Sequence, residues 1–104
     1  MNVAKLSDIA KLIRSKNAGP FWITFDIMFE TDADFDRVAN AEVINVDWVA
    51  KTYDVPVADI LLAHHKPARA IKFSFPRRPI QGDPGERDMY AGQQYAPVME
   101  LLIP

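Results

Sequence analysis

The clearest pattern in the chain is the alternation of apolar and polar residues over residues 21–29. Apolar side chains occupy every odd position of this stretch, while Thr24 and Asp26 interrupt the even positions. Because successive side chains of a strand point to opposite faces, the pattern predicts a strand with one deeply buried face. Trp22 and Met28 on the other face indicate that this face is partly covered as well.

Two helical patterns follow this strand. Thr31 begins the stretch TDADFDRVANAE, and Asp34 three residues later completes a start that resembles a capping box. A second pattern covers residues 45–53, with Asn45 placed as its N-cap. Pro56 limits this helix, because the residue before a proline is pushed away from helical geometry.

Three further strands are expected over residues 60–65, 68–75 and 98–103. Between the last two, residues 76–88 hold three prolines and two glycines, which predicts a loop of a length often associated with function. A short helix capped by Asp88 is expected to follow this loop.

The segment over residues 6–14 has two interpretations. Its apolar residues follow the three-and-four spacing of a helix, which Ser7 would begin and Gly19 would end. As a strand, the same segment would place Asp8 among apolar neighbours. The pattern alone favours the helix.

Taken in order, the elements are one ambiguous segment followed by strand, helix, helix, strand, strand, helix and strand. This order indicates an α+β fold, with a mostly antiparallel or mixed sheet and helices on one face. The length of 104 residues suits a single domain over residues 1–104. Small sheets of this kind leave edge strands, so a homodimer is expected when no other partner is present.

Charge and composition narrow the range of partners and sites that are expected. Twelve basic and fourteen acidic side chains give a net charge of -2 without a basic stripe, so nucleic acid is not expected as a partner. The chain has no cysteine, which removes disulfides and thiolate metal sites and agrees with a cytoplasmic location. No apolar run is long enough to span a membrane, so no membrane partner is expected.

Two stretches carry a family resemblance: KLSDIAKLIRSKNAGPFWITFDIMF near the start and GDPGERDMYAGQQYAPVMELLIP at the end. They resemble a small bacterial family of unknown function that is found beside AtuA-like (acyclic terpene utilisation) proteins. The layout is also similar to the ferredoxin-fold domain at the C-terminus of some AtuA-like proteins.

The resemblance implies a ferredoxin-like fold and a strand, rather than a helix, over residues 6–14. It also implies a small accessory subunit of an AtuA-like large protein, which helps to form a site for a carboxylate or acyl-CoA substrate in branched or terpenoid acid catabolism. The family offers no catalytic residues to carry over. Where the fused domains have an acidic, glycine-rich stretch, this chain has RSKNAG, so a role that needs those aspartates does not transfer.

The same RSKNAG stretch is the first candidate ligand site. Arg14 and Lys16 supply positive charge, Ser15 supplies a hydroxyl, and Asn17 with the following glycine would let backbone N–H groups converge on an anion. The alternative is a solvated turn in which these residues serve only the backbone.

The second candidate ligand site lies in the late segment and consists of Asp88, Tyr90, Gln93 and Gln94. On a short helix, Tyr90 and Gln94 would share one face and orient a carbonyl or amide. The alternatives are an interface with a partner chain, or a rigid connection in which Asp88 is only the N-cap.

Three residues are candidates for acid–base chemistry: Asp26, His64 and Tyr90. For Asp26, exposure or pairing with Arg14 or Lys72 is the competing interpretation. The adjacent His64 and His65 would point to opposite faces of a strand, so no metal site is expected, and no cofactor motif is visible. These candidates leave two other functions open: an independent hydratase, lyase or isomerase, and a module that binds acyl-CoA or carboxylate without chemistry.

Overall fold

The computed structural model describes residues 3–17, 22–76 and 96–104. The elements are β1 (Ala4–Lys5), α1 (Leu6–Ile9), β2 (Leu12–Asn17), β3 (Trp22–Met28), α2 (Asp32–Ala41), α3 (Val46–Tyr53), η1 (Val57–Asp59), β4 (Leu61–His65), η2 (Lys66–Ala68), β5 (Ala70–Pro76), α5 (Ala96–Met99) and β6 (Leu102–Ile103). The two η elements are short 3-10 helices. None of the helices within these ranges combines the length and hydropathy needed to cross a membrane.

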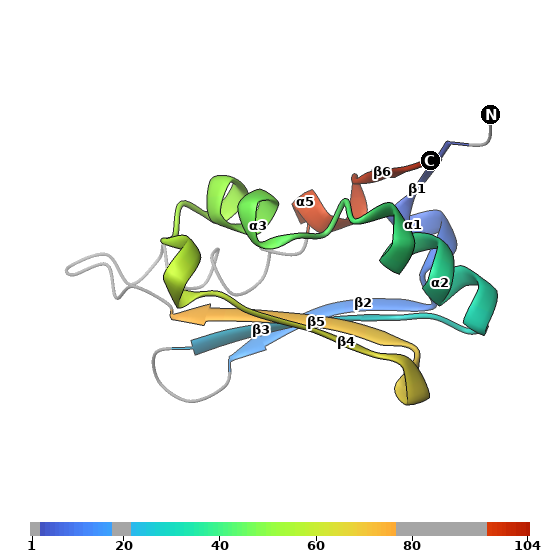
Figure 1. The fold of residues 1–104 in the computed structure, drawn as a ribbon, viewed down its shortest axis with the longest axis horizontal. Helices are drawn as coiled ribbons and strands as arrows, with labels where there is room; N and C mark the ends of the chain where they lie inside the picture. The colour runs from blue at the N-terminus through green and yellow to red at the C-terminus, as the bar shows by residue number, and fades with distance from the viewer. Residues whose placement is uncertain (1–2, 18–21, 77–95) are drawn as a thin grey trace.

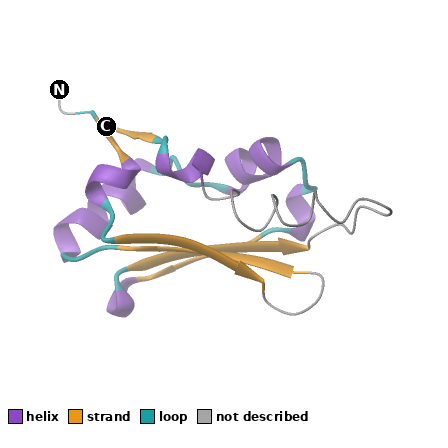
Figure 2. Cartoon of the chain, turned by 180° about the vertical axis from the view of Figure 1, so that it is seen from behind, coloured by secondary structure: helices purple, strands orange, loops and turns teal. Residues whose placement is uncertain are grey.

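The main sheet has four strands in the spatial order β2-β3-β5-β4, and all neighbours are antiparallel. β5 lies between β3 and β4 although it follows both in the chain, so the segment through α2 and α3 crosses over it. The α-helices lie on one side of this sheet, as Figures 1 and 2 show from opposite directions. The predicted α+β fold, with an antiparallel sheet and helices on one face, is confirmed.

The core lies between the sheet and the helices. Phe25 of β3 and Phe73 of β5 are opposite each other in the register, and their rings stack with centroids 4.6 Å apart. Tyr53 of α3 packs on this pair from the helical layer, 5.1 Å from the Phe25 ring. Each of these aromatic side chains removes a large apolar surface from water, so this cluster is a major source of stability.

The N-caps predicted at Thr31 and Asn45 are confirmed. The Thr31 hydroxyl accepts a hydrogen bond of 3.1 Å from the backbone N–H of Asp34 at the start of α2. The Asn45 side chain accepts one of 2.8 Å from the backbone N–H of Trp48 at the start of α3. Each bond satisfies a donor that the first turn of a helix leaves without an intrahelical partner.

Residues 6–14 form neither a single helix nor a single strand. α1 is one turn long, its N-cap is Lys5 instead of Ser7, and Ala10 already has extended geometry. β2 then begins at Leu12 and pairs with β3 through Asn17. The helical prediction therefore holds only for the first turn, because the hydrogen bonds to β3 determine the conformation of the remainder.

The strand predicted over residues 98–103 is wrong in most of its length. Val98 lies in α5, fully buried, and β6 contains only two residues. β6 pairs with β1, with Ile103 opposite Ala4, and not with the main sheet. The C-terminal segment thus closes the helical layer beside the N-terminus (Figure 2).

The strand predicted over residues 68–75 begins two residues later than expected. η2 fills the connection from β4, and Arg69 closes it with a positive φ of 51°. The Arg69 side chain donates a hydrogen bond of 2.7 Å to Asp32 at the start of α2, and Lys66 lies 3.4 Å from Asp36. These ion pairs hold the β4–β5 corner against the helical layer.

Candidate functional site

The face of the main sheet opposite the α-helices is called the uncovered face below. The register assigns to it alternate positions of each strand: residues 12, 14 and 16 of β2, 22–28 (even numbers) of β3, 70–76 (even numbers) of β5, and 61, 63 and 65 of β4. No α-helix of the described ranges lies over this face (Figure 1). Its exposed side chains are therefore available to another molecule.

A buried carboxylate lies at the centre of the uncovered face. Asp26 is 2% exposed, and the register places Arg14 and Lys72 on either side of it. The Arg14 Nε donates a hydrogen bond of 3.1 Å to Asp26 Oδ2, and the Lys72 Nζ lies 3.9 Å from Asp26 Oδ1. The predicted pairing of Asp26 with Arg14 or Lys72 is confirmed for both, and it links three strands.

The uncovered face carries more positive than negative charge. Lys16 is exposed beside Thr24, so Arg14, Lys16 and Lys72 share the face with the single carboxylate of Asp26. The Arg14 and Lys72 side chains are 51% and 52% exposed. Their outer N–H groups can therefore reach an anionic group of a second molecule while they stay paired with Asp26.

Exposed apolar side chains surround these charges. Leu12 of β2 is 42% exposed, Trp22 of β3 is 36% exposed and Leu61 of β4 is 62% exposed, and all three belong to the uncovered face. Large apolar side chains at the surface beside arginine are typical of protein interfaces. The chemistry of this face suits recognition of another protein.

The four polar residues of the RSKN stretch do not form one bend. They lie on β2, where Arg14 and Lys16 point to the uncovered face and Ser15 and Asn17 share the face of the helical layer. Strand geometry therefore separates the four side chains into two pairs on opposite faces, and binding of a ligand by either pair stays a prediction. The Ser15 Oγ is buried and has no hydrogen-bond partner among the described residues.

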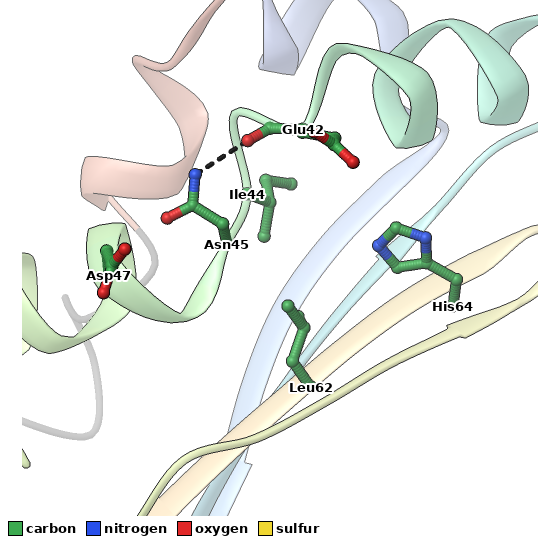
Figure 3. Close-up of a pocket in the computed structure, with 6 residues that line it drawn as sticks. All are labelled: Glu42, Ile44, Asn45, Asp47, Leu62 and His64. Atoms are coloured by element: carbon green, nitrogen blue, oxygen red, sulfur yellow. Dashed lines mark hydrogen bonds between the residues drawn. The ribbon is translucent and has the colours of Figure 1, made fainter. Parts of the chain in front are cut away.

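A second site is an open pocket of about 390 Å³ between β4 and the connection from α2 to α3. Figure 3 shows the six residues that line it: Glu42, Ile44, Asn45, Asp47, Leu62 and His64. The Asn45 Nδ2 donates a hydrogen bond of 2.7 Å to the Glu42 carbonyl and so fixes the connection above β4. Two carboxylates in this lining make the pocket unfavourable for an anionic ligand.

The two histidines point to opposite faces of β4, as their adjacent positions predict. His64 lies in the pocket and sets its ring edge-on to Phe35, with centroids 6.3 Å apart, whereas His65 belongs to the uncovered face. Within residues 3–17, 22–76 and 96–104, no group of three or more histidines and carboxylates is placed to hold a metal ion.

The second candidate ligand site, made of Asp88, Tyr90, Gln93 and Gln94, lies outside the described residues, as does the loop predicted over residues 76–88 after its first position. Of the three residues considered for acid–base chemistry, the structure therefore describes Asp26 and His64, and they lie on opposite faces of the sheet.

Sequence reasoning missed the residues that only the fold brings together. Glu42 and Asp47 line the same pocket as His64 because a helix connection lies over an edge strand. Leu12 and Leu61 were assigned no interface role, because exposure of an apolar residue depends on which face of the sheet the helices cover. The alternation around Trp22 was a usable signal, since it already separated this residue from the buried positions.

A family model described as a domain of unknown function (DUF4387) matches residues 6–102, which is nearly the whole chain. No curated protein and no solved structure matches it.

Proposed function

The chain belongs to the DUF4387 family, and on that premise we propose that the protein is a small accessory subunit that docks on a larger protein through the uncovered face. The observation that carries the proposal is the composition of this face: exposed Leu12, Trp22 and Leu61 surround a cluster with excess positive charge. Apolar contacts supply the binding free energy, and the charges select the partner and its orientation.

The larger protein in this proposal is AtuA-like. The support comes from the two sequence stretches that resemble the family found beside such proteins, and from a ferredoxin-like interpretation of the sheet. In the order β2-β3-β5-β4, an antiparallel strand lies inside a strand–helix–strand crossover, which is the split unit of ferredoxin-like folds. The fourth strand of this sheet, which lies beside β3 and outside the split unit, is β2, and β2 comes directly before β3 in the chain.

The proposed role of the complex is to form a site for a carboxylate or acyl-CoA substrate in branched or terpenoid acid catabolism in the cytoplasm. Arg14, Lys16 and Lys72 are the described groups suited to such an anion, because arginine pairs with carboxylate and phosphate groups in a bidentate manner. The pocket beside His64 is less suited, since Glu42 and Asp47 would repel the same ligand.

Co-expression with an AtuA-like protein from the same organism tests the proposal, with an affinity tag on the large chain only. We expect the small chain to co-purify in a fixed ratio, and Leu12→Lys to remove at least about nine-tenths of it, because hot-spot residues of an interface each contribute about 2 kcal/mol or more. The matched control is Leu102→Lys on β6 in the helical layer, a leucine that is also exposed, at 60% against 42% for Leu12.

Failure of the small chain to co-purify would contradict the proposed partner. Equal loss of binding in Leu12→Lys and Leu102→Lys would contradict the proposed surface. Circular dichroism of both variants establishes that each is folded, which is expected because both side chains are exposed.

A further inference from the structure

The two edges of the main sheet differ in their charges. On β2, Arg14 and Lys16 lie along the edge strand. β4, from Leu61 to His65, contains no lysine, arginine, aspartate or glutamate. Charged side chains, and lysine above all, are the usual means by which an edge strand avoids pairing with another chain. β4 lacks that protection, and no other strand of the described ranges pairs with its outer side.

We propose that β4 pairs with β4 of a second copy of this chain, antiparallel and about a two-fold axis at Ala63. In such a dimer the sheet continues across the axis, and both helical layers lie on the same side of it. Two residues that lie directly opposite each other must then belong to the same face of the sheet. This condition places the axis at a residue and not between two residues. With the axis at Ala63, Leu61 lies opposite the partner's His65 and Leu62 lies opposite the partner's His64.

Charge selects β4 over β2 for this pairing. On β2, two registers that meet the same condition pair most of the strand, and the first has its axis at Arg14, which sets this residue opposite the partner's Arg14. The second has its axis at Ser15, which sets Arg14 opposite the partner's Lys16. Either register brings like charges directly together across the strands, which is destabilising. The β4 register brings together only leucine, alanine and histidine. The β4 strand of a second copy can therefore pair with this edge.

The dimer completes the pocket. Leu62 and His64 both line it from β4, and they are the residues of this strand that face the helical layer. The proposed register therefore places the partner's His64 beside Leu62 at the mouth of the pocket, and the two pockets become neighbours across the axis. The inference does not rest on docking on a larger protein, because it uses the backbone edge of β4, although Leu61 belongs to both surfaces.

Substitutions that introduce a positive or a negative charge at Ala63, on the axis, test the interface. The purified full chain is expected to be a dimer by size-exclusion chromatography with light scattering. Ala63 is exposed on the uncovered face, so Ala63→Lys and Ala63→Glu keep the core intact. Each variant alone is expected to lose the dimer, and a mixture of the two is expected to restore it. Leu12→Lys on the other edge is the matched control and is expected to remain dimeric.

Engineered cysteines test the register, because the chain has none of its own. Directly opposed residues of antiparallel strands have Cβ atoms about 4.5–5.5 Å apart, close enough for oxidation to link them with little movement. Ala63→Cys alone is expected to give a disulfide-linked dimer. Leu62→Cys alone is not, whereas a mixture of Leu62→Cys with His64→Cys is expected to link.

A monomeric wild-type chain would overturn the proposal, and so would a dimer that persists in Ala63→Lys. Cross-linking of Leu62→Cys alone, without linking of Ala63→Cys, would overturn the register and with it the shared pocket. Circular dichroism confirms that each variant is folded, so loss of the dimer in the lysine and glutamate variants is distinguished from unfolding.

Discussion

At the scale of single residues, Asp26 connects stability with recognition. A carboxylate that is 2% exposed needs partners to offset the loss of hydration. Arg14 donates a hydrogen bond to Oδ2, whereas Lys72 supplies only a positive charge 3.9 Å from Oδ1, which has no hydrogen-bond partner among the described residues. Asp26 thereby holds two cations in fixed positions on the uncovered face. The same pairing argues against a role as a general base, since Asp26 Oδ2 already accepts a hydrogen bond from Arg14.

Replacing this carboxylate tests its structural role. Asp26→Asn leaves Arg14 and Lys72 without a counter-charge, and we expect the free energy of unfolding to fall by about 1–3 kcal/mol. Lys72→Met, which removes an ion pair of 3.9 Å with a cation that is 52% exposed, is expected to cost less than about 1 kcal/mol. Urea denaturation measures both. Equal effects would show that the buried carboxylate is no more important than its exposed partner.

At the scale of elements, the helix ends are determined by local chemistry. Thr31 and Asn45 cap α2 and α3 as their positions in the sequence predict. The C-terminal end of α2 was not predicted from the sequence. Glu42 ends this helix in the left-handed region with φ of 56°, where glycine is the usual residue.

Glu42 therefore offers a test of backbone strain beside the pocket. Glu42→Gly removes the steric cost of Cβ at positive φ, and we expect the free energy of unfolding to rise by about 0.5–1 kcal/mol. Glu42→Ala keeps the Cβ atom and is expected to bring no such gain. Thermal denaturation of the two variants separates the backbone from the side chain. The same gain in both would assign the effect to loss of the carboxylate.

At the scale of the whole molecule, the two ends of the chain close the core together. β1 and β6 pair beside each other, Lys5 lies 3.3 Å from Glu100, and the Arg37 Nε donates a hydrogen bond of 3.1 Å to the Pro104 carbonyl. Ile103 is fully buried, whereas its neighbour Leu102 is 60% exposed. The final strand thus contributes one core side chain over a short pairing.

Because Ile103 is buried and Leu102 is exposed, substitutions of these two residues are expected to differ greatly in their effect on the free energy of unfolding. Ile103→Ala leaves a cavity in the core and is expected to lower the free energy of unfolding by about 2–4 kcal/mol. Leu102→Ala removes an exposed side chain and is expected to change it by less than about 0.5 kcal/mol. Chemical denaturation of both variants measures the difference. Similar values for the two would mean that β6 is not part of the cooperative core.

The sequence by itself determined the features that depend on near neighbours. Alternation over residues 21–29 predicted β3 and its buried face, and the caps at Thr31 and Asn45 predicted the starts of two helices. These predictions hold because side-chain direction along a strand and hydrogen bonding in the first turn of a helix involve residues close together in the chain.

Only the tertiary structure decided which residues meet across the chain. It divided residues 6–14 between α1 and β2, paired the short last strand with β1, and separated Arg14 and Lys16 from Ser15 and Asn17. The physical reason is common to all three. Strand pairing is determined by free hydrogen-bonding edges and by the apolar surface that each register buries, and both depend on segments far apart in the sequence.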